Sequence, residues 1–174
     1  MIKSRIFLFL FFVFSILLTS CGSSTKKASS TSRSGTYSKN TSSSSVSAKR
    51  SNAVSHGLKY KGTHYKYGSA DASNGLDCSG FTTTVYKHIG ITLPRRSADQ
   101  ATTGKTVSLK DVKKGDLVFF KRDGAVFHVS MVTNVGNGKL EVIHSTSSKG
   151  VIVQDILQSS YWKPLISHFK SIID

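Results

Sequence analysis

Gly75-Leu76-Asp77-Cys78-Ser79-Gly80-Phe81 stands where a polar loop gives way to a helix. The helix is indicated by the apolar side chains of Phe81, Val85 and Ile89, which recur at intervals of four and therefore share one face. The positive end of a helix dipole favours a thiolate in the first turn, so we expect the pKa of the Cys78 thiol to be lowered. Because the thiolate is the reactive form of cysteine, Cys78 is predicted to be a nucleophile.

The charge of the chain is strongly basic and unevenly distributed. Its 174 residues include 24 lysines and arginines against 9 acidic residues, a formal net charge of +15, and no acidic residue precedes Asp71. Such an excess suggests an anionic neighbour, for example a membrane surface, an acidic polymer or nucleic acid. Neither a zinc-finger spacing nor an aromatic RNA-binding signature is present, so nucleic acid is not the expected partner.

Residues 1–20 have the pattern of a bacterial export signal. Lys3 and Arg5 precede an apolar run over residues 6–18, which is too short for a comfortable membrane span. The following Leu18-Thr19-Ser20-Cys21 resembles a lipobox, which implies cleavage before Cys21 and acylation of its thiol. Acyl chains would anchor the exported protein to the outer membrane, facing the periplasm, in an organism with two membranes, and otherwise to the outer face of the cell membrane. The alternative is an uncleaved anchor helix with a chance cysteine.

Residues 21–53 are predicted to be a lipidated, disordered tether, and residues 54–174 a folded domain. The tether is rich in serine and basic residues and has few apolar side chains to bury. Its basic residues could lie against anionic lipid or cell-wall polymer, or be merely solvated. A weak helix is indicated only near its end, over residues 48–58. If Cys21 carries lipid, Cys78 has no disulfide partner and remains a free thiol.

Helices followed by strands are indicated in the folded domain, which is an α+β arrangement. One helix begins at Cys78, and a short second helix closed by Gly104 is expected to begin with a capping box formed by Ser97 and Gln100. The period then becomes strand-like, and Asp123-Gly124 is typical of a hairpin turn. The expected strands form an antiparallel meander over residues 117–120, 125–133, 140–145, 151–155 and 165–173.

Two histidines interrupt strands that are otherwise built for burial. His128 lies in Val126-Phe127-His128-Val129, and His144 ends the run from Leu140. Counting outward from the turn around Gly136 places the two imidazoles opposite each other on the same face, where cross-strand side chains meet. They could be a base and its orienting partner for Cys78, or two independently satisfied core histidines. A Cys/His/His set could also hold zinc, but only three ligands at long spacing are offered, so no metal is expected.

The domain resembles the NlpC family of cell-wall cysteine peptidases, and the resemblance covers about residues 54–174. It implies a papain-like fold in which N-terminal helices pack on a five- to six-stranded antiparallel sheet. It also implies Cys78 as nucleophile, His128 as base and His144 as the orienting residue. The motifs that carry it, in order, are Tyr65-Lys66-Tyr67-Gly68, Asp77-Cys78-Ser79-Gly80-Phe81, Leu93-Pro94-Arg95-Arg96-Ser97-Ala98-Asp99-Gln100, Lys114-Gly115-Asp116-Leu117-Val118-Phe119-Phe120, His128-Val129 and Val142-Ile143-His144-Ser145.

The resemblance implies further site residues and a substrate. Tyr65 would lie near the oxyanion, and Asp77 and Ser79 would flank the substrate cleft. Arg95 could contact a substrate carboxylate, or be a solvated turn residue. The implied activity is cleavage of an amide bond in peptidoglycan stem peptides, typically between γ-D-glutamate and diaminopimelate or lysine, by a monomer without a cofactor. The alternatives are a non-catalytic peptidoglycan-binding lipoprotein and a papain-like acyltransferase that acts on lipid.

Overall fold

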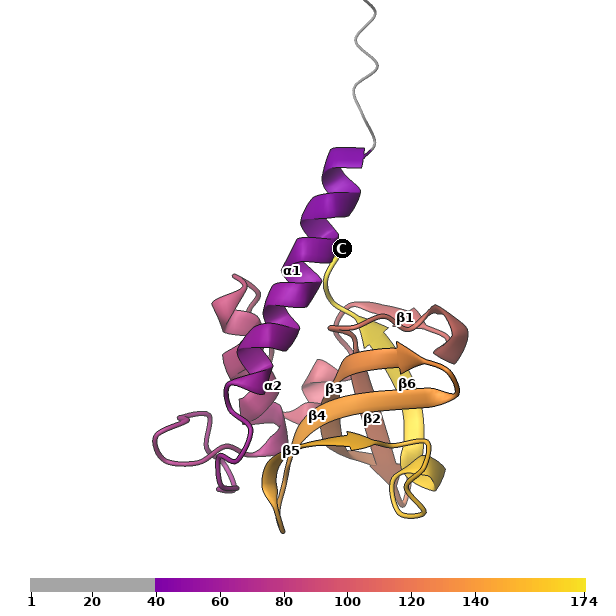
Figure 1. The fold of residues 1–174 in the computed structure, drawn as a ribbon. Helices are drawn as coiled ribbons and strands as arrows, with labels where there is room; N and C mark the ends of the chain where they lie inside the picture. The colour runs from indigo at the N-terminus through magenta and orange to yellow at the C-terminus, as the bar shows by residue number, and fades with distance from the viewer. Residues whose placement is uncertain (1–39) are drawn as a thin grey trace, which may run out of the picture. The chain divides into compact units, whose positions relative to one another are not determined.

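The computed structural model describes residues 40–174, in which helices pack on one side of a six-stranded antiparallel sheet (Figure 1). The predicted signal peptide, the lipidation site Cys21 and the tether up to residue 39 lie outside the described residues. The α+β fold class is confirmed. The elements are α1 (Asn40–Leu58), α2 (Cys78–His88), α3 (Ser97–Gln100), β1 (Lys105–Val107), β2 (Leu117–Arg122), β3 (Ala125–Gly136), β4 (Lys139–Thr146), β5 (Gly150–Asp155) and β6 (Ile166–Ser171), with short 3-10 turns at Leu109–Asp111 and Lys163–Leu165.

The sheet has the strand order β1-β6-β2-β3-β4-β5. Strands β2 to β5 form the predicted meander, and β6 returns beside β2. The turn between β2 and β3 places Asp123 and Gly124 at φ values of 51° and 78°, the left-handed pair that suits a two-residue hairpin. Strand β1 was not predicted, because Lys105–Val107 is a short edge strand with two exposed residues and no apolar alternation.

Helix α2, which carries Cys78, packs on one face of the sheet, while His128 and His144 lie on the other face, with Phe120 and Val142. The predicted apolar stripe of α2 is confirmed, since Phe81 and Val85 are fully buried. They belong to a cluster that includes Val129 and Met131 of β3 and Ile143 of β4. Alternate residues of the same strands form a second cluster on the opposite face, which includes Val118, Phe120, Val132, Leu140 and Val142. The sheet is therefore buried on both faces, and side chains on either face can be held rigidly.

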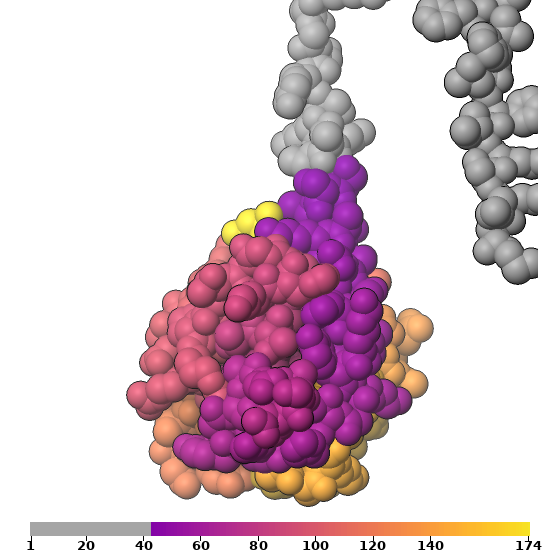
Figure 2. Space-filling view, turned by 90° about the vertical axis from the view of Figure 1, so that its left-hand side faces the viewer, coloured from indigo at the N-terminus to yellow at the C-terminus, as the bar shows by residue number. Residues whose placement is uncertain are grey.

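Helix α1 begins at Asn40, so the prediction that disorder extends to residue 53 is wrong for residues 40–53. One stripe of the helix contacts the domain: Val46 packs against the core, Arg50 is buried, and Ala53 is fully buried. At Gly57 the helix comes so close to β3 that an added Cβ would stand 2.8 Å from Cε of Met131. The remaining surface is serine-rich and exposed, which is why the composition suggested a coil (Figure 2).

The buried stripe of α1 is held by Arg50, which the sequence had placed among solvated tether residues. Its guanidinium pairs with Asp116 at 2.6 Å and donates hydrogen bonds to the Ser171 hydroxyl and the Ile173 carbonyl at 2.6 Å each. Helix α1 and the C-terminal segment therefore lie side by side, as Figure 1 shows. Within residues 40–174, no helix has both the length and the apolar character needed to cross a bilayer.

Candidate active site

Cys78 opens α2, and its position is fixed by the residues on either side. The Asp77 carboxylate caps the helix by accepting a hydrogen bond from the Gly80 N–H at 2.6 Å. Gly80 is required because a Cβ there would collide with the backbone carbonyl of Ser69. The Cys78 side chain is buried, with 8% of its surface exposed. Cys78 is the one cysteine within residues 40–174, and its thiol is free.

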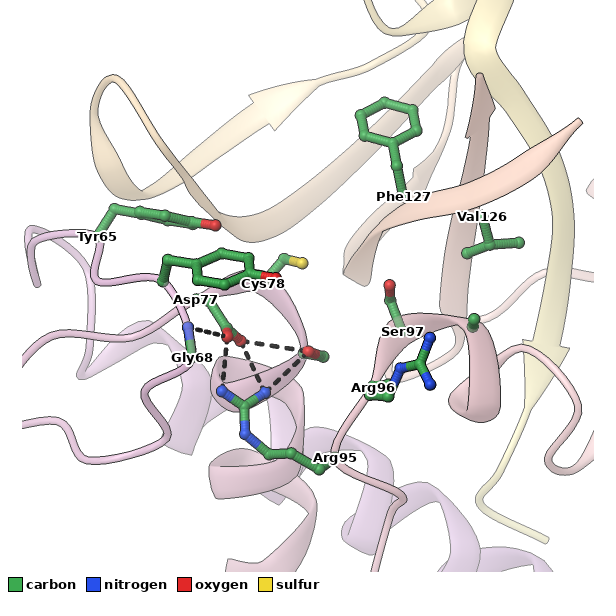
Figure 3. A pocket seen from close by; sticks show the side chains of 12 residues that line it. Tyr65, Gly68, Asp77, Cys78, Arg95, Arg96, Ser97, Val126 and Phe127 are labelled. Atoms are coloured by element: carbon green, nitrogen blue, oxygen red, sulfur yellow. Dashed lines mark hydrogen bonds and ion pairs between the residues drawn. The ribbon is translucent and has the colours of Figure 1, made fainter. Parts of the chain in front are cut away.

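Two cavities meet at Cys78, and they form the candidate cleft; Figure 3 shows the residues that line the first of them, cavity A. Cavity A, of about 360 Å³, is lined by Asp77, Ser79, Arg95 and Arg96 among others. Cavity B, of about 500 Å³, is lined among others by His128, Gln154, Tyr161, Trp162 and the loop 145–149. Tyr65, Cys78 and Phe127 line both cavities. An extended substrate can therefore place one part in each cavity with its reacting bond at the sulfur.

His128 and His144 contact each other as predicted, with Nε2 of His128 2.9 Å from Nδ1 of His144. The predicted register is wrong, however. The turn is Asn137-Gly138 rather than one centred on Gly136, since Gly136 pairs with Lys139, and an irregularity at Thr133 then changes the register by one residue. Met131 therefore pairs with Ile143, and His144 stands level with Ser130 rather than His128. The two histidines are diagonal neighbours on the same face, a separation that long or aromatic side chains span.

Both histidines are neutral near pH 7 because they are buried. Burial lowers the pKa of His128 well below its ordinary value, and His144 lowers it further. Burial lowers the pKa of His144 to about 4, although the Gln154 side chain acts in the opposite direction. Trp162 closes over the pair, with its ring centroid 4.6 Å from that of His128 and 5.0 Å from that of His144. The hydrogen bond between the rings therefore joins one donor nitrogen and one acceptor nitrogen.

The expectation that the pKa of Cys78 is lowered is wrong, although backbone N–H groups at the helix start do act in that direction. Burial raises the pKa of the thiol, and the negative charge of Asp77 raises it further, against the opposing effect of a hydrogen bond from the Val129 backbone. The effect of the helix N-terminus is smaller than the desolvation that β3 and the surrounding loops impose on the sulfur. The resting site thus holds a neutral thiol and a neutral imidazole on the wall of the same cavity.

The predicted substrate-contact residues form one hydrogen-bonded cluster in cavity A. Nη1 and Nη2 of Arg95 donate to the two Asp77 oxygens at 2.9 and 2.6 Å, and Nη1 also donates to the Ser79 hydroxyl at 2.9 Å. Although burial alone would raise it, hydrogen bonds from Arg95 and Gly80 hold the pKa of Asp77 below its usual range. The Gly68 N–H adds a further bond at 2.9 Å, as Figure 3 shows. Asp77 is therefore an ionised anchor rather than a spare base.

Tyr65 points its hydroxyl toward Cys78 (Figure 3). Burial raises the pKa of this phenol, and Cys78 and Asp77 raise it further. The hydroxyl therefore stays protonated and is available as a hydrogen-bond donor beside the sulfur. The position agrees with the role expected of Tyr65, which remains a prediction.

Phe127 and Trp162 are site residues that the sequence did not identify. Phe127 is half-buried and lines both cavities, and Trp162 covers the histidine pair. Phe127 has no partner in the pairing of β2 with β3, where the register shifts, and no local sequence pattern indicates this irregularity. The capping box at Ser97 is also absent: Arg96 is the N-cap, and the Gln100 amide donates instead to the carbonyls of Ser79 and Pro94.

The other histidines of the domain have structural surroundings. His56 stacks on His88 with ring centroids 3.6 Å apart, and His168 stacks on Phe119. Among residues 40–174, no three His, Cys, Asp or Glu side chains are grouped so as to hold a metal ion. The arrangement at Cys78 offers a thiol, a neutral base and a hydrogen-bond donor at the junction of two cavities, which suits nucleophilic attack on a carbonyl.

Comparison with known proteins places this geometry among cell-wall enzymes. A model of the NlpC/P60 family matches residues 62–171. The chain is 38% identical over 109 residues to the gamma-DL-glutamyl hydrolase of Bacillus subtilis, which covers 63% of this chain and 26% of that protein. It is 31% identical over 115 residues to the murein DD-endopeptidase/LD-carboxypeptidase MepS of Escherichia coli, covering 66% and 58% respectively.

A solved structure of an NlpC/P60 family protein from Bacillus cereus matches with a TM-score of 0.64 and 32% identity, over 72% of this chain and 40% of that one. The chain thus spans less than two thirds of the length of each of these relatives.

Proposed function

Because the chain belongs to the NlpC/P60 family, we propose that it is a cysteine endopeptidase that cleaves an amide bond in peptidoglycan stem peptides. The bond would be the one between the γ-carboxyl of D-glutamate and diaminopimelate or lysine. The observation that carries the proposal is the position of Cys78 at the junction of two cavities, with a neutral His128 lining one of them and bonded to His144. The relatives are named for gamma-glutamyl and murein bonds, which agrees with this substrate class.

The chemistry starts from the neutral pair. Nε2 of His128 is engaged by His144, so Nδ1 is the nitrogen that accepts the proton from Cys78 as the sulfur attacks the amide carbonyl. For this, Nε2–H of His128 donates to Nδ1 of His144, which holds the ring orientation and stabilises the imidazolium that forms. His128 then gives the proton to the leaving amine, and water releases the acyl group from the sulfur with the same residue as base.

The developing oxyanion needs donors that are already in place. The Tyr65 hydroxyl, which stays protonated, is one donor, and a backbone N–H at the start of α2 is the other. Neither donor has to reorganise during the reaction. Asp77 and Arg95 line cavity A and would bind the part of the substrate that lies there, mainly through the exposed part of the Arg95 side chain.

The proposal includes export and a lipid anchor at Cys21, which rest on the sequence of residues 1–21. A monomer anchored in this way would act on peptidoglycan beside the membrane, within reach of the tether. Replacement of Cys21 by serine should move the protein from the membrane fraction to the soluble fraction. Retention of the variant in the membrane fraction would contradict lipidation.

The test of the activity uses the full chain, purified in detergent, with isolated muropeptides. Mass analysis should show products that have gained one water and carry a new free amine, and Cys78→Ala should abolish them while leaving the melting temperature similar. Digestion by the Cys78→Ala protein would refute the mechanism. Binding of peptidoglycan without products would favour the non-catalytic alternative, and transfer of an acyl group to lipid would favour the acyltransferase.

A further inference from the structure

The orientation of the substrate follows from which cavity holds the base. His128 lines cavity B and is absent from the lining of cavity A. The leaving amine must receive its proton from this imidazole, so the amine side of the scissile bond lies toward cavity B. The acyl side then extends into cavity A, past Asp77 and Ser79. This step rests on the proposed peptidase activity.

Cavity B is lined by two cations and by no acidic side chain. Arg122 comes from the end of β2, and Lys149 from the loop between β4 and β5. Neither forms an ion pair within the described part of the chain, where Arg50 and Arg95 pair with aspartates. Both side chains are exposed at the edge of the cleft, and unpaired cations that line a cleft raise the local concentration of carboxylate ligands.

Arg122 is held in place before any ligand arrives. Its guanidinium carbon lies 4.6 Å from the centroid of the Phe127 ring and 5.8 Å from that of Tyr161. One of its nitrogens also donates a hydrogen bond to the Tyr161 hydroxyl. A guanidinium that is stacked and bonded in this way loses little freedom on binding, and four of its five N–H donors remain available.

The two diamino acids found at the amine side of the bond differ in a way that cavity B can recognise. Diaminopimelate carries a carboxylate at the far end of its side chain, where lysine carries only an ammonium group. The ammonium would be repelled by Arg122 and Lys149, whereas the carboxylate would be paired. The rings of Tyr161 and Trp162 on the same wall can pack against the methylene groups between.

We propose that Arg122 and Lys149 form a subsite for the side-chain carboxylate of the amine-side residue, so that the protein prefers stem peptides containing diaminopimelate to those containing lysine.

The experiment compares kcat/KM of the full chain in detergent on three tripeptides, L-Ala-γ-D-Glu linked to diaminopimelate, to diaminopimelate amidated on its side-chain carboxyl, and to lysine. We expect the free acid to be preferred over the other two by about 10- to 100-fold, as for one or two charge-assisted hydrogen bonds. Arg122→Gln should reduce this ratio at least about fivefold, and the double variant with Lys149→Gln should bring it close to one. Lys121→Gln removes a charge from the exposed neighbour, which lines neither cavity, and should leave the ratio unchanged.

The outcomes separate this proposal from the proposed function. Equal cleavage of all three peptides would overturn the subsite while the peptidase activity stands, and cleavage of none would refute the activity itself. Tetrapeptides with the same three residues test the other carboxylate, the one at the end of the tripeptide. A fall in kcat/KM by the same factor for all three peptides when D-alanine masks this terminus, with the ratio among them unchanged by Arg122→Gln, would assign the cations to the chain end and overturn the side-chain subsite.

Discussion

Replacing Arg50 by alanine should destabilise the whole domain, although Arg50 lies far along the chain from the site. The residue is 8% exposed, and its partner Asp116 is 1% exposed. Its guanidinium donates to the Asp116 carboxylate at 2.6 Å, to the Ser171 hydroxyl and the Ile173 carbonyl at 2.6 Å, and to the Lys114 carbonyl at 3.1 Å. Alanine would leave a buried carboxylate without its cation.

The magnitude follows from what the substitution leaves behind. Removing one partner of a buried ion pair costs about 3–5 kcal/mol. Asp116 keeps a hydrogen bond from the Lys113 N–H at 2.8 Å, and two surface cavities beside Arg50 let water reach the gap. These features favour the lower end, about 3 kcal/mol. With a urea m-value of about 2 kcal/mol/M, the unfolding midpoint should fall by about 1.5 M.

The assay is urea unfolding of residues 22–174, followed by far-ultraviolet circular dichroism and by the fluorescence of Trp162. Lys49→Ala is the matched control, because Lys49 is the exposed neighbour on α1 and should change the free energy of unfolding by less than about 0.5 kcal/mol. If Arg50→Ala shifts the midpoint no more than Lys49→Ala does, α1 does not belong to the cooperative unit and the buried ion pair has been misjudged.

Two further predictions concern the site. Burial lowers the pKa of His144 from about 6.5 to about 4, so between pH 6.5 and pH 4 the unfolded chain binds a proton that the folded chain excludes. The free energy of unfolding should therefore fall by about 3 kcal/mol as the pH falls from 6.5 to 4. His144→Asn should flatten this dependence of stability on pH, measured by urea unfolding. An unchanged slope in the variant would show that His144 is not held neutral by burial. Tyr65→Phe removes one oxyanion donor and should lower kcat about 100-fold with little change in KM; a rise in KM alone would make Tyr65 a binding residue instead.

The sequence predicted the sheet well because its signals there are local. Two-residue turns with left-handed residues, such as Asp123-Gly124, define where strands end, and alternating burial defines which face each residue occupies. The contact between His128 and His144 was predicted for the same reason. Its register was missed because the tight turn is Asn137-Gly138, with both residues at positive φ, rather than a turn centred on Gly136; the irregularity at Thr133 changes the register by only one residue.

Helix α1 shows the opposite case. Its serine-rich sequence has weak helix propensity, and the helix is stabilised by contacts with residues more than sixty positions away, among them Asp116 and Ser171. From the sequence alone, a basic residue in a polar segment is expected to be solvated, because its buried partner is not known. The composition therefore identified the segment as a tether, whereas residues 40–53 belong to the folded unit.

The pKa of Cys78 was mispredicted for the same reason as helix α1, because it depends on residues that only the fold brings together. The helix start alone would favour a thiolate, but β3 and the loops around Cys78 desolvate the sulfur, and burial is the larger effect. The same burial keeps His128 neutral. Neutral partners mean that the nucleophile forms only as the proton moves to His128 during attack. Since thiolates are the species that oxidants modify, the resting neutral thiol is also less readily oxidised. Alkylation by iodoacetamide should accordingly accelerate steadily with pH up to and beyond the ordinary thiol pKa, whereas a thiolate–imidazolium pair would react at full rate near neutrality.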